Sequence, residues 1–366
     1  MVVDFNYIFF YLGLFILTLF LSQFIFSRYI GFAKRYNLVK AQSTRASHKG
    51  QVFTGGGVVL AAVIMVATLV LHDLDFTEFS DFSSVIATSI LVSVLGFYDD
   101  FTDISAFQKY IILTFLILML LYSNSTIPII QNLNGFLGIY SIGFIPGLIF
   151  TSFVYLSIMN AINLTDGIDG YLAIFSIFFF ISSFEINHIN EYYTLTSIAI
   201  ILIASAIIFI RYNFSKGKKL FIGDAGSLFI GFWISTFLIT YITSAPNAKI
   251  VQVFSIKLEN IPVIAISLIS IPVIDTLRVM FVRIINKTSP FSADNNHLHH
   301  ILLNNGFSHL RTSLSLTFIN GFICVGIFLI EPIFNSVELT GIYILINIFW
   351  LVFFEFLNIR SKRLIF

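Results

Sequence analysis

The sequence predicts an all-α, polytopic integral membrane protein, and three observations support this fold class. Hydrophobic residues make up 57% of the 366 residues and charged residues only 11%, with a mean hydropathy of +0.94. A soluble domain carries roughly 25% charged residues. Apolar runs long enough to cross a ~30 Å hydrocarbon core recur along the whole chain. The basic residues gather in some of the connections between these runs and are nearly absent from the others. We therefore expect about eleven transmembrane helices in a single domain over residues 1–366.

The predicted spans follow one another at a spacing too short for any large soluble domain. In chain order they are Phe5–Phe26, Gly55–Leu71, Ser84–Leu95, Tyr110–Ile130, Ile142–Met159, Tyr171–Phe184, Tyr193–Ile210, Leu228–Tyr241, Ile261–Phe281, Ser313–Ile330 and Thr340–Phe356. The third and eighth are short, so we expect both to extend into the polar motifs beside them. No basic residue precedes the first run and several follow it, which predicts a retained span with an outside N-terminus rather than a cleaved signal.

The basic residues predict the orientation of the spans. Eighteen of the 20 Lys and Arg residues fall on one side, and only Lys249 and Lys257 fall on the other. The positive-inside rule makes the basic side cytoplasmic, so eleven spans place the C-terminus inside. The loops expected at about residues 31–54, 97–109, 160–171, 211–227 and 282–311 then lie on the cytoplasmic face of the membrane. The opposite loops, including Glu331-Pro332, are interpreted as solvated turns.

Composition excludes several classes of site and partner. The single cysteine, Cys324, rules out disulfides within the chain and a Cys-ligated metal. The 44 phenylalanines could suggest stacking on nucleic acid, but no dense basic patch accompanies them. A lipid-facing role explains them better, so membrane lipids are expected partners and nucleic acid is not.

Two adjacent carboxylates, Asp99 and Asp100, end the third predicted span. Neighbouring carboxylates repel, so they persist where a divalent cation, a lysine or a shared proton compensates. Lys109 lies near the start of the next span and could reach the same surface. The alternative is an ordinary solvated helix end.

Four short polar side chains repeat at helical spacing after the fifth predicted span. Asp166 and Asp169 are three residues apart, and Asn160 and Asn163 repeat that spacing one turn earlier. On a helix start such a set would share one face, and the flanking glycines let the backbone approach a ligand closely. A stripe of this kind at the end of an apolar helix would be costly without a partner.

The segment Phe221-Ile-Gly223-Asp224-Ala-Gly-Ser227 precedes the eighth predicted span. A glycine-rich turn with Ser at a helix start offers N–H groups to phosphate. Asp224 suits Mg²⁺, which prefers few carboxylates together with phosphate oxygens. The segment is not a P-loop, because the Gly-Lys-Ser/Thr ending is absent.

Three histidines, His297, His299 and His300, lie in the long basic loop after the ninth span. They could form a zinc site, but no partner cysteine exists. Hydrogen bonding or charge donation to a pyrophosphate fits the other motifs better, and a solvated loop is the bland alternative.

A basic segment opens the second span. Arg45, His48 and Lys49 precede Thr54-Gly-Gly-Gly57 on the same predicted face. Alone, this segment would pass for a juxtamembrane patch that binds anionic lipid; beside the other motifs it offers cationic and glycine-rich contacts to a substrate.

These five clusters, in this order and orientation, resemble the polyprenyl-phosphate N-acetylhexosamine-1-phosphate transferases of glycosyltransferase family 4. The resemblance runs from about Arg45 to Ser308. The Arg-x-Ser-His…Gly-Gly-Gly and His-Leu-His-His…Gly-Phe-Ser-His patterns look more like the GlcNAc-1-phosphate branch than the phospho-MurNAc-pentapeptide branch.

The resemblance implies an enzyme of the glycosyl-1-phosphate transferase kind. It would transfer N-acetylhexosamine-1-phosphate, by branch GlcNAc-1-phosphate, from a UDP-sugar to undecaprenyl phosphate. UMP would be released and a cell-envelope glycan, such as the O-antigen of lipopolysaccharide, would be started. The implied cofactor is Mg²⁺, with Mn²⁺ as an expected substitute. Direct attack is favoured over a phospho-enzyme, although both routes stay open.

The family's functional residues carry over onto matching positions of this sequence. The implied catalytic residues are Asp99, Asp100, Asp166, Asp169, His297, His299 and His300. The implied substrate-binding residues are Arg45, His48, Lys49, Thr54, Lys109, Asn160, Asn163, Phe221, Gly223 and Ser227. The implied metal ligands are Asp224, Asp100 and Asp166. Among these, Asp99 would serve as base or lipid-phosphate organiser, and Phe221 would stack on uracil.

Two positions depart from the family's pattern. The usual Asp-x-Pro before the first basic motif is here Val39-Lys40-Ala41, and the usual Arg after His-His is Ile301. The second departure bears on the contacts to sugar or pyrophosphate.

Other readings remain open. The donor could be another UDP-HexNAc, a deoxy-sugar or a phospho-MurNAc-pentapeptide nucleotide, and the oligomeric state is open, with a homodimer among the options. An ion-coupled transporter would need carboxylates near mid-membrane, where only Asp275 suits. A CDP-alcohol phosphotransferase would need Ala-Arg shortly after its Asp-Gly, whereas Tyr171-Leu-Ala-Ile174 follows here.

Overall fold

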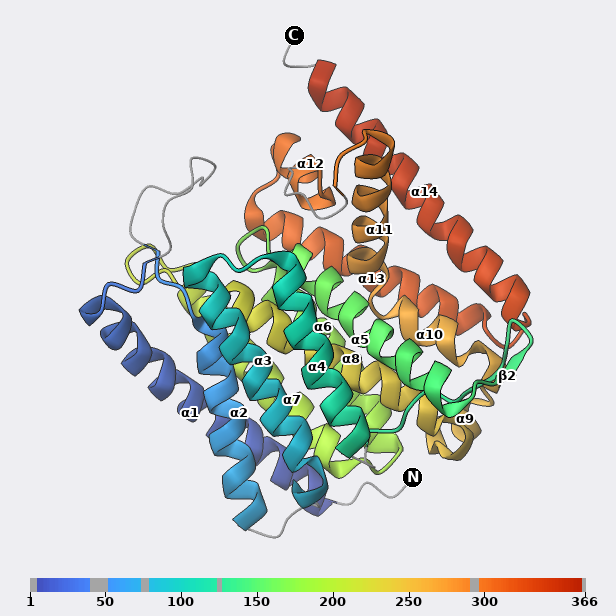
Figure 1. Cartoon of the computed structure of the whole chain (residues 1–366), viewed down its shortest axis with the longest axis horizontal. Helices are drawn as coiled ribbons and strands as arrows, with labels where there is room; N and C mark the ends of the chain where they lie inside the picture. The colour runs from blue at the N-terminus through green and yellow to red at the C-terminus, as the bar shows by residue number, and fades with distance from the viewer. Residues whose placement is uncertain (1–4, 40–51, 74–78, 124–126, 290–295, 364–366) are drawn as a thin grey trace. The chain divides into compact units, whose positions relative to one another are not determined.

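The computed structural model describes residues 5–39, 52–73, 79–123, 127–289 and 296–363. Within these ranges ten helices are long and apolar enough to cross a membrane, and a bent pair of helices makes an eleventh candidate span. The predicted polytopic all-α membrane protein is confirmed at this level (Figure 1). One exception is a small antiparallel hairpin, β1 (Asn132–Phe136) and β2 (Ile139–Ser141).

The chain divides into two compact units. Unit 1 comprises Met1–Thr126 and Ser176–Ile234, and unit 2 comprises Ile127–Phe175 and Ser235–Phe366. Two of the three boundaries fall inside helices, α6 (Tyr171–Ile189) and α8 (Gly223–Ser244). Each unit is described by itself, and the single domain expected from the sequence stays a prediction.

Unit 1 is built on five complete long helices. They are α1 (Phe5–Arg35), α2 (Gly56–Asp73), α3 (Ser83–Thr102) and α7 (Tyr193–Asn213), with α4 (Ala106–Ser123) beside α3. Helix α1 packs along α7, where the Ser22 and Ser205 hydroxyls lie 3.2 Å apart and the Phe26 and Tyr212 rings stack. Helix α3 extends to Thr102, beyond the short apolar run predicted at 84–95, so its last turns carry the acidic motif as expected.

Close backbone packing joins the start of α2 to the start of α8. Gly56 N–H donates to the Phe221 carbonyl and Gly57 N–H to the Ile222 carbonyl, both at 3.0 Å. A Cβ atom on Gly57 would lie 2.0 Å from the backbone nitrogen of Gly226. The glycines at these positions therefore allow two backbones to touch, which a side chain would prevent.

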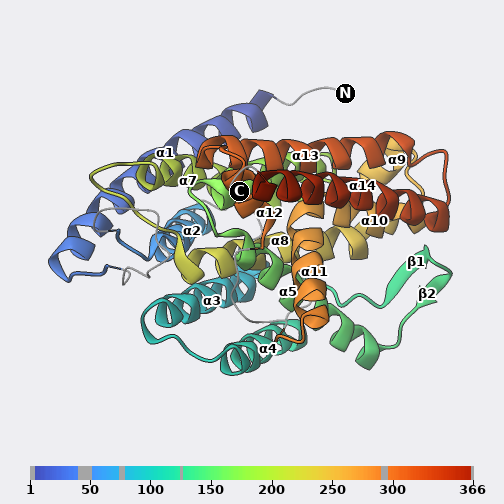
Figure 2. The same ribbon diagram turned by 90° about the horizontal axis from the view of Figure 1, so that it is seen from above.

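Unit 2 holds α5 (Phe144–Thr165), α13 (His309–Ile330) and α14 (Ser336–Arg363). The shorter helices include α9 (Lys249–Phe254), α10 (Ile261–Ser267), α11 (Ser270–Ile285) and α12 (Leu298–Asn304). Helix α11 packs on α5 and α13, while α12 lies against α13 and α14. Figure 2 shows the hairpin as an arm that leads into α5.

The ninth predicted span is broken. A segment from Leu258 to Ser267 and helix α11 meet at an angle of 74°. Asn320 of α13 joins both sides of the break, because its Nδ2 donates to the Leu268 carbonyl (2.8 Å) and its Oδ1 accepts from Ile271 N–H (2.9 Å). A broken helix in an apolar region needs such replacement hydrogen bonds, so the fully buried Asn320 stabilises the bend.

One predicted solvated turn is wrong. Glu331 is only 1% exposed, and its Oε1 accepts from Lys257 N–H (2.8 Å) and from Asn260 Nδ2 (2.9 Å). The Lys257 ammonium donates to the Phe334 carbonyl at 3.0 Å. The sequence shows Glu-Pro after an apolar run, which is typical of an exposed turn, but the buried partners come from a segment about 70 residues earlier.

Candidate active site

Two clusters of ionisable side chains stand out, one in each unit. In unit 1 the ammonium of Lys109 donates to Oδ2 of Asp99 at 2.7 Å and also to Oδ2 of Asp224. The Lys109 and Asp99 side chains are 15% and 11% exposed, whereas that of Asp224 is 31% exposed. One cation thus bridges two carboxylates that are 125 positions apart in sequence, and only Asp224 keeps substantial access to solvent.

Local structure holds Asp99 in place. Its second oxygen, Oδ1, accepts from Ile104 N–H at 2.9 Å. Helix α3 ends at Thr102, and the left-handed φ of 47° at the next residue, Asp103, turns the chain so that Ile104 N–H can reach back. Because α4 begins at Ala106, this short turn also brings Lys109 onto the end of α3. The sequence prediction that Lys109 reaches the Asp99-Asp100 surface is consistent with this geometry.

Asp100 anchors the start of α8. Its Oδ1 accepts from Asp224 N–H at 3.0 Å, and its Oδ2 accepts from the Thr54 hydroxyl at 3.3 Å. A carboxylate at a helix N-terminus is stabilised by the unpaired N–H groups and the helix dipole. A Cβ on Gly223, which has φ of 68°, would lie 2.2 Å from Asp100 Oδ2. The structure thus places Asp100, Thr54 and Gly223 in one contact that positions Asp224.

The other residues of the Phe221 motif differ in exposure. Ser227 is fully buried, and its hydroxyl lies 3.5 Å from the Asp224 carbonyl oxygen, so the structure gives it a packing position at the helix start. Phe221 is partly buried, and the Lys219 ammonium lies 5.4 Å from its ring centroid. This distance allows a cation–π contact, so Lys219 already lies over one face of the ring.

The oxygen donors of unit 1 suit a hard divalent cation. Mg²⁺ is often bound by one or two carboxylates together with substrate phosphates and water. Among the residues that the structure describes, no group of three His, Cys, Asp or Glu side chains is placed to hold an ion alone. Asp224, with its partly exposed carboxylate, therefore fits a shared site that a substrate phosphate completes.

In unit 2 a buried aspartate organises the histidine motif. Asp275 Oδ2 lies 3.0 Å from Nδ1 of His297, and its Oδ1 accepts from Arg278 Nη2 (3.1 Å). Leu298 N–H reaches both carboxylate oxygens, at 3.1 and 3.2 Å. Arg278 also donates to the Asn296 carbonyl. Asp275 on α11 thereby fixes the segment from Asn296 to Leu298, at the point where α12 begins.

His299 is almost completely enclosed. Its ring stacks on that of His297, with centroids 5.5 Å apart, and its exposed fraction is 2%. Its Nε2 points at the Asp166–Asp169 segment, since a Cβ on Gly167 would lie 2.2 Å from that atom. Burial is the main cause that lowers the pKa of His299 to about 3, followed by the charge of His300. His299 is therefore neutral at physiological pH, whereas His300 beside it, with centroids 4.3 Å apart, is only half-buried.

The aspartates of the Asp166–Asp169 segment have different partners. Asp169 lies 3.3 Å from Nδ1 of His309 through its Oδ2, and its carbonyl accepts from the Ser313 hydroxyl at 3.1 Å. Asp166 follows the end of α5, and its N–H donates to the Asn163 carbonyl at 3.2 Å. Asn160 and Asn163 lie on the last two turns of α5. Asn160 and Asn163 thus lie at the end of an apolar helix, as predicted, whereas Asp166 and Asp169 lie in the turn between α5 and α6 rather than on a helix start.

Sequence reasoning missed three of these residues as site members. Arg278 and Asp275 belong to no motif, although a carboxylate inside the ninth span is rare enough to draw attention to Asp275. His309 closes the Gly-Phe-Ser-His pattern, but the sequence assigned it no role. The contacts of Asp275 with His297 and of His309 with Asp169 span 22 and 140 positions, and Arg278 reaches Asn296 across 18 positions. Of the predicted residues, Arg45, His48 and Lys49 lie outside the described residues.

The fold and these clusters define a class of protein. An all-helical membrane protein with a lysine between two carboxylates and an aspartate beside histidines has the groups that phosphoryl transfer needs, namely positioned charges and oxygen donors for a metal. Residues 82–242 match the family model described as glycosyl transferase family 4. This match covers 161 of the 366 residues, so it shows a similarity to this family over somewhat less than half of the chain.

Curated relatives extend the match well beyond that segment. A probable undecaprenyl-phosphate N-acetylglucosaminyl 1-phosphate transferase of Bacillus subtilis (strain 168) is 29% identical over 296 residues, covering 80% of this chain and 76% of that protein. The undecaprenyl-phosphate alpha-N-acetylglucosaminyl 1-phosphate transferase of Escherichia coli (strain K12) is 28% identical, covering 78% and 74%. A decaprenyl-phosphate N-acetylglucosaminephosphotransferase of Mycolicibacterium smegmatis is 27% identical, covering 73% and 68%.

Proposed function

We propose that this protein transfers GlcNAc-1-phosphate from UDP-GlcNAc to undecaprenyl phosphate. An oxygen of the lipid phosphate attacks the sugar-linked phosphorus, the bond to the bridging oxygen of the diphosphate breaks, and UMP leaves. The observation that carries the proposal is the similarity to transferases of this name over about four fifths of the chain. The lysine-bridged pair of carboxylates, Asp99 and Asp224, is the structural feature that suits the chemistry.

In unit 1 we assign the binding of the metal ion and of the acceptor phosphate. Asp224 is the best-placed metal ligand because its carboxylate is partly exposed at the start of α8, and Asp100 supports it from the side. A bound Mg²⁺ would supply neutralisation of the developing phosphate charge. Asp99 and Lys109 lie next to this position, so Asp99 orients the acceptor phosphate and Lys109 contributes positive charge to it.

In unit 2 we assign contacts with the nucleotide-sugar. His300 is the most exposed of the three motif histidines, and it suits a phosphate or sugar contact. His297 is held by Asp275, and neutral His299 offers a hydrogen bond rather than charge. Asn163, Asp166 and Asp169 remain the candidates for the donor's polar groups, in keeping with the sequence motif.

The reaction that we propose takes place at the cytoplasmic face of the membrane. With 18 of 20 basic residues on one side, the N-terminus lies outside and the motifs face the cytoplasm, where nucleotide sugars are made. In a bacterium this membrane is the inner membrane. A lipid acceptor suits such a site, because its phosphate lies at headgroup depth while its chain stays in hydrocarbon.

The test is a reaction of purified protein with undecaprenyl phosphate, MgCl₂ and a panel of donors. UDP-GlcNAc is expected to release UMP and give a lipid-linked product, whereas UDP-MurNAc-pentapeptide is not. Asp224→Ala is expected to abolish Mg²⁺-dependent UMP release, and Asp99→Asn to keep nucleotide binding with little turnover. Full activity of either variant would remove the role assigned to that residue, and turnover of another UDP-HexNAc alone would change the donor.

A further inference from the structure

Helix α1 is longer than the hydrocarbon core that it crosses. Its candidate span, Ile8–Arg35, has 28 residues, which at 1.5 Å per residue extends about 42 Å against a core of ~30 Å. The last turns of α1 therefore emerge at the depth of the lipid headgroups. The first basic residue of the chain, Arg28, lies where this emergence begins.

The two faces of α1 differ in what covers them. Ser22, Phe26, Ile30 and Ala33 are buried within unit 1. The opposite face is exposed and apolar over several turns, with an unbroken stripe at helical spacing formed by Phe9, Leu12, Ile16, Phe20 and Phe24. In a membrane protein such a stripe faces lipid acyl chains.

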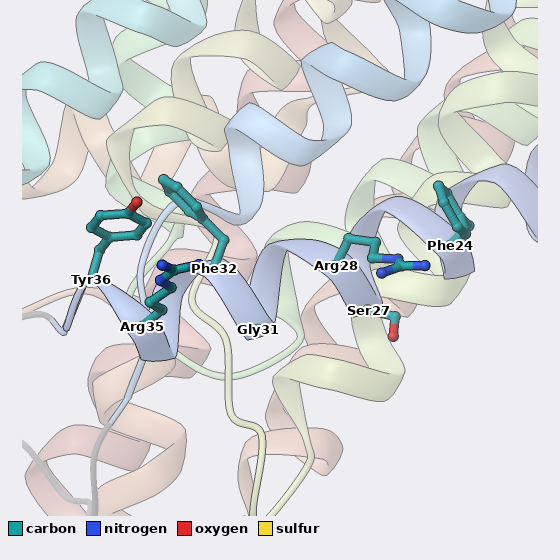
Figure 3. Close-up of a pocket in the computed structure, with 7 residues that line it drawn as sticks. All are labelled: Phe24, Ser27, Arg28, Gly31, Phe32, Arg35 and Tyr36. Atoms are coloured by element: carbon teal, nitrogen blue, oxygen red, sulfur yellow. The ribbon is translucent and has the colours of Figure 1, made fainter.

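This stripe ends in a hollow on the surface of α1 (Figure 3). Arg28 and Arg35 lie on either side of Gly31, Phe32 lies beside Arg35, and Phe24 and Tyr36 lie farther out along the chain. The Arg28 guanidinium lies 5.3 Å from the Phe24 ring centroid, and that of Arg35 lies 5.9 Å from the Tyr36 ring centroid. A Cβ on Gly31 would meet nothing within 4 Å, so the space above it is open.

The two arginines of the hollow, Arg28 and Arg35, favour the binding of an anion. Arg28 and Arg35 are seven residues apart, so they project from the same face of the helix about 10.5 Å apart along its axis. In the part of the chain that the structure describes, neither guanidinium has a carboxylate partner. Guanidinium groups bind phosphate oxygens through paired N–H donors, and both side chains are long enough to reach over Gly31.

We propose that this hollow binds the phosphate headgroup of an anionic phospholipid, with one acyl chain along the Phe9–Phe24 stripe. The phosphate lies between Arg28 and Arg35, and Phe24 and Phe32 contact the upper part of the chain. The site is separate from the residues assigned to catalysis and does not depend on the proposed function.

Lipid retention in native mass spectrometry tests the site. The full-length protein is purified from detergent supplemented with phosphatidylglycerol or with phosphatidylcholine. We expect one phosphatidylglycerol to be retained preferentially. Each guanidinium near a membrane surface strengthens the binding of an anionic lipid about fivefold. The preference of the Arg28→Gln/Arg35→Gln variant for phosphatidylglycerol should therefore fall roughly 25-fold. Gly31→Leu, which fills open space in a helix, should lose binding while keeping its thermal midpoint.

Matched variants separate this site from general charge. Lys34→Gln removes the same charge from the same end of α1, on another face, and should keep the preference. Gly13→Leu also fills open space on α1, away from the hollow, and should bind normally. An equal loss in Lys34→Gln, or full retention in Gly31→Leu, would overturn the proposal. So would displacement of the lipid by inorganic phosphate, or retention of polyprenyl phosphate alone.

Discussion

Nδ1 of His297 lies 3.0 Å from Oδ2 of Asp275, and both side chains are more than nine-tenths buried. A carboxylate at this distance keeps the proton of a neutral imidazole on Nδ1 and leaves Nε2 as an acceptor. The same carboxylate accepts from Leu298 N–H and from Arg278. Asp275 therefore sets both the tautomer of His297 and the position of the start of α12, the helix that carries His299 and His300.

Asp275→Asn is expected to reduce turnover strongly. The carboxamide removes the charge that balances Arg278 and offers one acceptor in place of two, so the His297 tautomer is no longer fixed. Loss of one member of a buried charged pair costs roughly 3–5 kcal/mol. We expect kcat to fall at least tenfold with a smaller change in the KM for the donor. The measurement is steady-state release of UMP, with the thermal midpoint recorded alongside.

A suitable control for this change is Asp73→Asn, at a side chain that is 86% exposed. It removes an equal charge and should leave kcat and the thermal midpoint unchanged. If Asp275→Asn retained kcat despite a lowered midpoint, the role of Asp275 would be limited to stability.

Lys109→Gln is expected to alter the response to metal. Lys109 is the cation between Asp99 and Asp224, and its removal leaves two neighbouring carboxylates that repel each other and attract a divalent ion more strongly. We expect Mg²⁺ to raise the thermal midpoint more in the variant than in the wild type, while turnover falls roughly 100-fold. Lys216→Gln, in an exposed loop, is the matched control. An unchanged Mg²⁺ response would show that Lys109 does not compete with the metal.

The sequence predicts features that depend on one segment alone, but not those that depend on contacts between distant segments. Hydropathy predicted each of the ten unbroken candidate spans of the described residues, because lipid imposes a long apolar run on every crossing helix. It could not show the 74° break in the ninth span, since the hydrogen bonds that permit it come from Asn320, which is one polar residue in an apolar run. The burial of Glu331 could not be predicted either, because its hydrogen-bond partners, Lys257 and Asn260, lie in a distant segment.

The candidate site shows the same limit. Asp99, Lys109 and Asp224 could be linked from sequence because each ends or begins a span on the basic side. The partners of Asp275 could not, since pairing with His297 depends on how α11 leaves the bend. Glycines were recognised as points of close approach, but Gly57 approaches another backbone, whereas a ligand had been expected.

Gly57→Ala is expected to destabilise the protein although it adds one methyl group. The new Cβ would lie 2.0 Å from the Gly226 nitrogen, which is backbone and cannot rotate away. The starts of α2 and α8 must then separate, at a cost of about 1–3 kcal/mol for overpacking. Gly326→Ala, with nothing within 4 Å of the added atom, should be neutral or slightly stabilising in its helix. Thermal midpoints in one detergent compare the two, and equal midpoints would contradict the backbone contact.

His299 is expected to make stability depend on pH. Its pKa is about 3 in the folded protein, mainly because of burial, against 6.5 ordinarily. Between these values the unfolded chain binds a proton that the folded protein does not. The free energy of unfolding therefore falls as the pH drops below 6.5, by up to about 1.4 kcal/mol per pH unit, and this group contributes no change above 6.5.

Thermal midpoints at pH 7 and pH 5 measure this effect. His299→Gln should show a smaller loss between the two pH values than the wild type, because glutamine does not titrate. His72→Gln removes a histidine whose side chain is 59% exposed and should leave the loss unchanged. A wild-type-sized loss in His299→Gln would mean that other groups cause the acid sensitivity.

Asn320→Leu is expected to weaken both the fold of unit 2 and turnover. Leucine has nearly the same size but leaves the Leu268 carbonyl and the Ile271 N–H without their partner, and each unsatisfied buried group costs about 1–3 kcal/mol. Asp275 follows Ile271 by one helical turn, so a relaxed bend also moves the carboxylate that holds His297. Asn347→Leu is the control, since this buried asparagine donates to the Tyr343 carbonyl one turn earlier in its own helix rather than to the backbone at the bend. We expect Asn320→Leu, but not Asn347→Leu, to lower both the thermal midpoint and kcat. A normal kcat in the fraction of Asn320→Leu that stays folded would show that the bend does not position His297 and the start of α12.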